Sequence, residues 1–179
     1  MIYKEERISS ERIYEGKILN LRKDIVTTVS GKPASREIVE HNGAVAMVAL
    51  TDSGKIIMEK QYRYAMDEVI FEVPAGKIEK DEADSLTAAK RELREETGYV
   101  ASELKKLGLI FPSVAYTEEG IEVYLCTGLT KYERNLDDDE AIDIFECDFD
   151  EVCRMAKQGK MFDAKSICAV FMARAQMKG

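Results

Sequence analysis

The stretch from Ala75 to Gly98, AGKIEKDEADSLTAAKRELREETG, constrains the fold most, because it encodes an amphipathic helix together with its start and stop signals. Asp84 or Ser85 can cap the first turn. Gly98 can end the helix, since the residue after the last turn often adopts a left-handed conformation. Apolar residues recur at spacings of three and four, and they are Leu86, Ala89 and Leu93. We therefore expect one face of this helix to pack on a sheet.

Three glutamates, Glu92, Glu95 and Glu96, lie beside that apolar stripe in the last turns of the expected helix. Two carboxylates about 4 Å apart repel by roughly 4 kcal/mol at an effective dielectric near 20. The helix dipole disfavours each anion there by a further ~0.3–1 kcal/mol. An ordinary solvated face, with Arg91 and Glu95 as an i,i+4 pair, is the alternative. Residues that break local stability rules tend to serve function, so the cluster predicts a cation site.

A hard divalent cation would resolve this repulsion. Mg²⁺ prefers oxygen ligands and combines one or two carboxylates with water and substrate phosphate. Such ions stabilise both the attacking and the leaving oxygen of a displacement at phosphorus. The Pro74-Ala75-Gly76 turn brings backbone close to the helix, and the Ala75 carbonyl is a candidate further ligand. The segment thus predicts metal-assisted cleavage of a pyrophosphate.

The order of elements along the chain predicts an α/β fold. Residues 8–40 contain strand-like pieces and a turn at residues 30–33, which indicates a small antiparallel β lobe. Residues 44–50 (AVAMVAL) read as a buried strand, and residues 55–63 as a second strand forming a hairpin with it. Further strands are expected at 68–73, 104–111, 121–127 and 141–147, and helices at 151–158 and 164–177. We expect a mixed sheet between helices, with residues 1–41 as the lobe and 42–179 as the catalytic domain.

Composition and charge narrow the range of possible binding partners. The 179 residues carry a net charge of −8, which opposes binding to nucleic acid. No apolar run approaches the roughly 20 residues of a membrane span, and the charged N-terminus does not read as a signal peptide. We therefore expect no association with a membrane and a cytoplasmic location. One histidine and four cysteines without a CxxC pair argue against zinc. Cys126 and Cys168 lie in apolar stretches and are expected to be reduced core thiols.

The helix segment resembles the Nudix box, Gly-x5-Glu-x7-Arg-Glu-U-x-Glu-Glu-x-Gly-U with U apolar. Gly76 and Glu82 match its first half, and residues 91–99 (RELREETGY) match its second half. Eight residues instead of seven separate the halves. We expect the extra residue in the loop before the helix, which leaves the carboxylates unshifted.

Residues 36–41 (REIVEH), 60–63 (KQYR) and 72–77 (EVPAGK) are similar to the ADP-ribose pyrophosphatase branch of that family. This resemblance implies an α/β/α sandwich with an N-terminal β lobe exchanged in a homodimer. It also implies hydrolysis of ADP-ribose or a related nucleoside diphosphate sugar to a nucleoside monophosphate and a sugar phosphate, with Mg²⁺ as the cofactor and Mn²⁺ as a substitute. Its metal ligands would be the Ala75 carbonyl, Glu92 and Glu96, with Glu95 assisting catalysis.

The resemblance also implies roles outside the box. Arg36 and Arg63 would contact the diphosphate or the terminal ribose, because a guanidinium donates two parallel hydrogen bonds. Glu140, just before the strand at 141–147, would act as general base, with Asp139 in reserve; a solvated acidic turn is the alternative. Glu118 and Glu119 would reach the metal or the terminal sugar.

One loop differs in sequence from the ADP-ribose pyrophosphatase branch, so the identity of the substrate is not fixed by the resemblance. Residues 113–119 read SVAYTEE, where the branch often carries Ser-Pro-Gly followed by acidic residues. GDP-mannose or another nucleoside diphosphate sugar is therefore a rival substrate. A nucleotide-sensing domain without catalysis is a second alternative, and the retained carboxylates weigh against it.

Overall fold

The computed structural model describes residues 3–136 and 141–177. The chain divides into two compact units, one made of residues 1–43 and 111–120, the other of residues 44–110 and 121–179. None of the helices in the described part of the chain is both long enough and apolar enough to cross a membrane.

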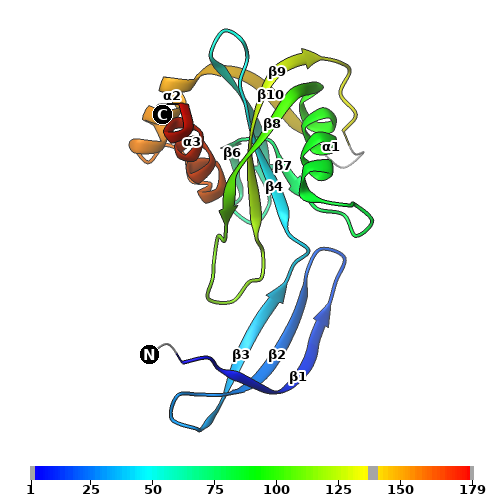
Figure 1. The fold of residues 1–179 in the computed structure, drawn as a ribbon, viewed down its shortest axis with the longest axis vertical. Coiled ribbons are helices and arrows are strands. Elements are labelled where there is room, and N and C mark those ends of the chain that lie inside the picture. The colour runs from blue at the N-terminus through cyan, green and yellow to red at the C-terminus, as the bar shows by residue number, and fades with distance from the viewer. Residues whose placement is uncertain (1–2, 137–140, 178–179) are drawn as a thin grey trace. The chain divides into compact units, whose positions relative to one another are not determined.

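The first unit is an antiparallel sheet in the order β1(Glu6–Glu15), β2(Asn20–Thr27), β3(Pro33–Glu40) (Figure 1). The segment 111–120 attaches to the end of this sheet through two backbone hydrogen bonds. The Val39 N–H donates to the Tyr116 carbonyl at 2.7 Å, and the Glu118 N–H donates to the Val39 carbonyl at 3.0 Å. The loop whose sequence departs from the branch is therefore held by the N-terminal sheet.

The second unit contains two sheets. The larger has the order β7(Ala75–Lys77), β4(Ala44–Ala49), β9(Ile121–Lys131), β8(Tyr99–Ile110), with β4 parallel to β9 and the other pairs antiparallel. The smaller is antiparallel, in the order β10(Ile142–Asp148), β5(Lys55–Arg63), β6(Glu68–Glu72). The mixed sheet expected from the sequence is confirmed.

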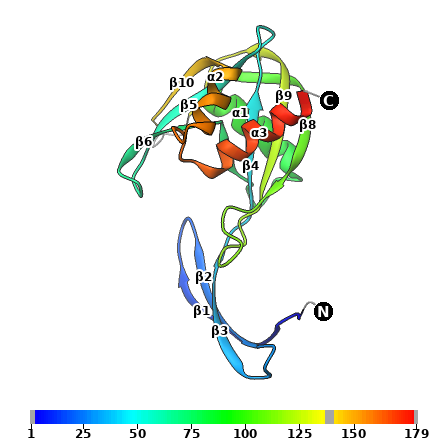
Figure 2. The ribbon, with the colours of Figure 1, turned by 90° about the vertical axis from the view of Figure 1, so that its left-hand side faces the viewer.

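The core lies on both faces of β4, whose six residues are all buried. Side chains alternate along a strand, so Ala46 and Val48 pack on the side of α2(Phe149–Lys157) and α3(Ala164–Met177). Val45 and Met47 pack on the side of α1(Ser85–Thr97). Figure 2 views the sheet from the side that α2 and α3 cover, with α1 behind it. The α/β/α sandwich predicted from the sequence is therefore confirmed.

The expected hairpin between residues 44–50 and 55–63 is wrong. The two segments share one antiparallel bridge, Leu50–Ile56, and then continue into different sheets. Both edges of β4 are occupied, by β7 on one side and β9 on the other. A buried central strand has no edge left for its neighbour in sequence, so β5 pairs with β6 and β10 instead.

The expectation for the cysteines is half right. All four are free thiols, and Cys126 is buried, but Cys168 is exposed. The buried positions of α3 are Ser166, Ala169, Val170 and Ala173. Helix α3 is apolar around most of its circumference, so composition alone does not identify its buried side.

Candidate active site

Helix α1 begins and ends where the sequence predicts. The Asp84 carboxylate accepts from the Thr87 N–H at 2.8 Å and so caps the first turn. Gly98 has φ 74°, a left-handed conformation, and its N–H donates to the Arg94 carbonyl at 2.9 Å. The buried residues Ala88, Ala89 and Leu93 fix the rotation of the helix. This rotation decides which glutamates face the sheet.

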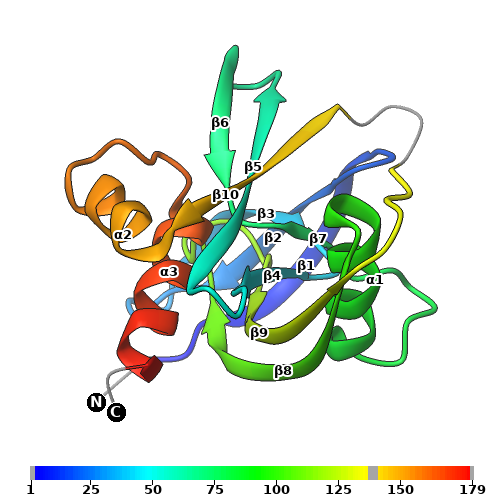
Figure 3. The same cartoon turned by 90° about the horizontal axis from the view of Figure 1, so that it is seen from above.

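Glu96 lies at the boundary between α1 and the strand β7. The residue is 5% exposed, and its Oε2 accepts from the Ala75 N–H at 3.0 Å. The preceding Pro74 carbonyl accepts from the Met47 N–H at 2.8 Å, which fixes the turn to β4. Figure 3 shows β7 beside α1. The structure thus brings Ala75 and Glu96 together.

Glu92 occupies space that only a glycine at position 76 leaves open. A Cβ placed on Gly76 would overlap the Cδ and both oxygens of the Glu92 carboxylate. The side chain of Glu92 is 13% exposed, and Arg91 Nη1 lies 2.8 Å from its Oε1. Glu92, Glu96 and the backbone of residues 75–76 form one niche, which we call the carboxylate niche.

Arg91 holds the glutamates around this niche. Its Nε donates to Glu82 at 2.8 Å, and its Nη1 lies 2.9 Å from Glu95. Hydrogen bonds to Glu82 and Glu95 and the charge of Glu92 raise the pKa of Arg91. Glu82 reaches Arg91 despite the extra residue, and α1 begins only at Ser85. The contact between Glu82 and Arg91 is thus made although eight residues separate them, and the placement of the extra residue before the helix stays a prediction.

The donor set fits a hard divalent cation. In residues 3–136 and 141–177, no three side chains of His, Cys, Asp or Glu gather closely enough to hold a metal together. The carboxylate niche offers two carboxylates beside a backbone strand, in a cradle that depends on a missing Cβ. Mg²⁺ commonly takes one or two carboxylates and completes its shell with water and substrate phosphate. The niche matches this requirement.

A second group of charged side chains is centred on Glu72, the last residue of β6, which is bound by Arg63, the last residue of β5. Arg63 donates to the two Glu72 oxygens, from Nε at 2.6 Å and from Nη2 at 2.8 Å. Lys165 also donates to Glu72 and lies 2.9 Å from Asp163. Burial opposes the charge of Glu72, but Arg63 and Lys165 outweigh it and lower the pKa of that carboxyl. We call these four residues the Glu72 cluster.

The Glu72 cluster is connected to the carboxylate niche. Hydrogen bonding to Glu72 raises the pKa of Arg63, and the charge of Glu96 adds to this effect. The Ser166 hydroxyl, at the start of α3, accepts from the Val73 N–H at 2.9 Å. It thereby fixes the chain between Glu72 and the Pro74-Ala75 turn. Arg63, expected from the sequence to contact the diphosphate, lies within electrostatic range of Glu96.

The sequence reasoning assigned no role to Glu72, Asp163 or Lys165. A signal existed for Glu72, which interrupts an apolar strand two residues before Pro74. No local signal existed for Lys165, because its partner Glu72 is 93 positions away along the chain.

The remaining predicted residues lie elsewhere. Arg36 and Glu118 belong to the first unit, where Arg36 donates to Glu5 at 2.9 Å and Arg22 donates to Glu118 at 2.6 Å. Glu140 and its reserve Asp139 lie outside the described residues. The roles assigned to these four residues stay predictions.

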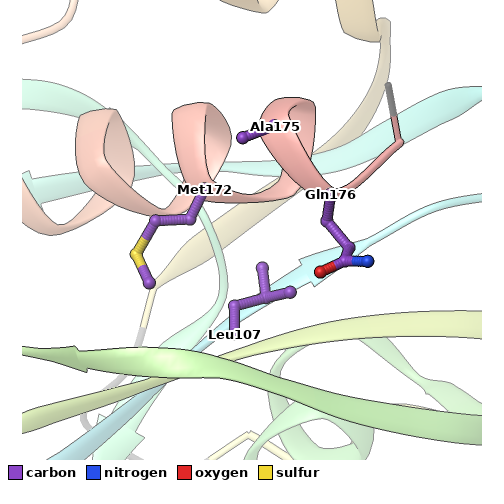
Figure 4. A pocket seen from close by; sticks show the side chains of 4 residues that line it. All are labelled: Leu107, Met172, Ala175 and Gln176. Atoms are coloured by element: carbon purple, nitrogen blue, oxygen red, sulfur yellow. The ribbon is translucent and has the colours of Figure 1, made fainter. Parts of the chain in front are cut away.

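A pocket of about 450 Å³ lies between β8 and α3 (Figure 4). Its lining residues are Leu107, Met172, Ala175 and Gln176. None of these four carries a charge, and a diphosphate requires cationic partners. This pocket does not suit the chemistry of the carboxylate niche.

Comparisons with known proteins identify the family and several relatives of this chain. The NUDIX domain model matches residues 40–170, and the model of the nucleoside diphosphate sugar hydrolase N-terminal domain matches residues 5–39. The chain is 40% identical over 168 residues to ADP-ribose pyrophosphatase of Bacillus subtilis (strain 168), covering 93% of this chain and 90% of that protein. It is 39% identical over 171 residues to methanol dehydrogenase activator of Bacillus methanolicus, covering 94% and 92%. A crystal structure of an ADP compounds hydrolase shares the fold, with a TM-score of 0.87 and 19% identity over 100% of this chain and 97% of that one.

Proposed function

Because the chain belongs to the Nudix family, we propose that it hydrolyses the pyrophosphate bond of ADP-ribose or a related nucleoside diphosphate sugar with a divalent cation, preferably Mg²⁺. The products would be a nucleoside monophosphate and a sugar phosphate. The carboxylate niche carries the proposal, because Glu96 is held by the Ala75 N–H and Glu92 fills the space beside Gly76. The relative from Bacillus subtilis supports ADP-ribose as the first substrate to test.

In the proposed mechanism Glu92, Glu96 and the Ala75 carbonyl would hold the cation. A bound Mg²⁺ would neutralise charge that develops on the phosphate oxygens. Arg91 keeps Glu92 and Glu95 in place through its contacts with both. Glu95 would assist from this position by keeping Arg91 oriented toward the niche.

Arg63 would bind the diphosphate. Glu72 engages the edge of the guanidinium that carries Nε and Nη2, so the opposite edge with Nη1 faces away from Glu72. That edge can donate to a phosphate oxygen, in the charge-assisted geometry that arginine favours. In the first unit, Arg36 is proposed to contact the diphosphate or the terminal ribose, and Glu118 the metal or the terminal sugar.

The attacking water needs a base. We assign this role to Glu140, with Asp139 in reserve, because this acidic run lies just before β10 in the sequence. The base would take the proton of the water as its oxygen attacks phosphorus and the bond to the bridging oxygen breaks.

A panel of nucleoside diphosphate derivatives with Mg²⁺ or Mn²⁺ tests the proposal. ADP-ribose should give AMP and ribose 5-phosphate, and turnover of GDP-mannose alone would reassign the substrate. Glu96→Gln should lower kcat by several orders of magnitude with the fold intact, whereas Glu103→Gln, at an exposed position on β8, should leave it unchanged. Near-normal activity of Glu96→Gln would contradict the metal assignment. Tight binding of ADP-ribose without turnover in any metal would favour a sensing domain.

We further propose that residues 1–41 form a lobe through which two chains dimerise, with residues 42–179 as the catalytic domain. All ten residues of β1 are exposed, including Ile8, Ile13 and Tyr14. An exposed strand with apolar side chains readily pairs with another chain. Light scattering should give twice the chain mass of 20.2 kDa, and a monomer would contradict the proposal. The four free cysteines support a reducing compartment such as the cytoplasm.

A further inference from the structure

Glu59 is a buried carboxyl group to which the proposed mechanism assigns no role. It follows the buried residues Ile56, Ile57 and Met58 on β5 and is itself 3% exposed. Its Oε1 has no hydrogen-bond partner among residues 3–136 and 141–177. A buried polar atom without a hydrogen bond lowers the stability of the fold, so its presence here needs an explanation.

Glu59 faces Glu72 directly. The two are register partners in the antiparallel pair β5–β6, so their side chains project from the same face of the sheet with Cβ atoms about 4.5–5.5 Å apart. Glu72 is also 3% exposed. Two buried carboxyl groups therefore share one location.

The charges around Glu59 come from four elements. They are Glu72 on β6, Arg63 on β5 itself, Lys165 on α3 and Arg134 in the segment after β9. On β10 the register partner of Glu59 is the apolar Ile144. The charges that act on Arg63 also include Asp163, just before α3, and Glu96 on α1.

The contacts decide which of the two carboxyl groups is ionised. Two carboxylates this close and this buried do not ionise together readily. Glu72 is in direct contact with both Arg63 and Lys165, so it keeps the negative charge. Burial and then the charge of Glu72 raise the pKa of Glu59 to about 8, although Lys165, Arg134 and Arg63 act in the opposite direction. Glu59 is accordingly the member of the pair that holds the proton.

We propose that Glu59 is a positioning residue, which stays protonated beside Glu72 and thereby keeps Arg63 and Lys165 fixed on that single carboxylate at the edge of the diphosphate site. The inference deepens the proposed function, because it rests on Arg63 as the diphosphate ligand. When Glu59 loses its proton, a second negative charge competes for the same two cations. It also repels the diphosphate, so binding of the substrate weakens at alkaline pH.

Glu59→Gln tests this role, since glutamine has nearly the same shape and does not titrate. We would measure KM and kcat for ADP-ribose at saturating Mg²⁺ across about pH 6–9.5. In the wild type, KM should rise above about pH 8 and approach a tenfold change per pH unit, as expected for a single proton. In Glu59→Gln, KM should stay level over the same range, while Glu103→Gln should retain the wild-type profile. A rise of KM in Glu59→Gln equal to that of the wild type would overturn the proposal.

A second measurement needs neither turnover nor a folded variant. Wild-type protein with ¹³C-labelled glutamate carboxyl groups should show one glutamate that titrates near pH 8 by NMR. If every glutamate titrates in the usual acidic range, the role of Glu59 is refuted. A protein that shows the titration but hydrolyses no diphosphate would refute the proposed function and leave the protonation of Glu59 standing.

Discussion

Replacing Gly76 by alanine should disable the site through a single side chain. The added Cβ would overlap the Cδ, Oε1 and Oε2 atoms of Glu92, which are its three nearest neighbours. Gly76 lies in β7 and does not have the positive φ that would itself exclude alanine. The backbone can therefore accept the substitution, and the Glu92 carboxylate has to move.

The size of the effect follows from that displacement. The nearest Glu92 atom lies 2.0 Å from the added Cβ and ordinary contact begins at 3.4 Å, so the carboxylate has to move by more than 1 Å. A misplacement of about 1 Å in a catalytic group can cost about 100-fold in rate. We expect kcat to fall by about that factor. Overpacking of this kind also lowers the free energy of unfolding by about 1–3 kcal/mol.

A double-mutant cycle provides the assay. Gly76→Ala, Glu92→Ala and the double variant would be compared in kcat at saturating Mg²⁺, with Tm from calorimetry. If Gly76→Ala acts only by displacing the Glu92 carboxylate, it should not lower kcat any further in a protein that already carries Glu92→Ala. Gly54→Ala, in an open turn with φ 79°, should lower stability without changing kcat. The reasoning fails if Gly76→Ala leaves kcat within about threefold of the wild type, or if it costs the same factor with and without Glu92.

Two further predictions concern stability. Ser166→Ala leaves the buried Val73 N–H without its partner, so urea unfolding should show a loss of about 1–3 kcal/mol; an unchanged midpoint would contradict the role of this bond. Glu59 has a folded pKa of about 8, above its ordinary value of 4.5, so the native state binds more protons between these values. The contribution of Glu59 to the free energy of unfolding is complete below about pH 4.5. It is lost as the pH rises toward 8, by at most about 1.4 kcal/mol per pH unit. Glu59→Gln should therefore gain stability relative to the wild type over this window, and a constant difference would contradict it.

The features that were predicted correctly depend on local chemistry. The start of α1 at Asp84 and its end at Gly98 follow from capping rules that act within one turn. The burial of β4 follows from its unbroken apolar run. The false hairpin shows the limit of such reasoning, because strand pairing depends on which edges other segments already occupy. β9 pairs with β4 in parallel although Ile121 is 77 positions after Ala44 in the numbering.

The same limit applies to the site. Spacing along α1 was enough to predict that Glu92 and Glu96 share a flank, and Ala75 was expected nearby because the turn precedes the helix. Glu59 and Glu72 face each other only because of the β5–β6 register. Lys165 reaches Glu72 only because α3 packs with its first turn at that strand end. No pattern within one element predicts either relationship.

The distribution of charge explains why the proton on Glu59 matters for a metal site. At the carboxylate niche, Arg91 contacts three carboxylates, Glu82, Glu92 and Glu95. The excess of negative charge there favours a divalent cation. Around Glu72, by contrast, the cations Arg63 and Lys165 balance the carboxylates, which keeps this side able to receive a diphosphate. An ionised Glu59 would make both sides negative, so the substrate would be repelled at the place where Arg63 should attract it. Protonation of Glu59 therefore keeps the Glu72 cluster from becoming negative, while the carboxylate niche stays negative and can bind a metal ion.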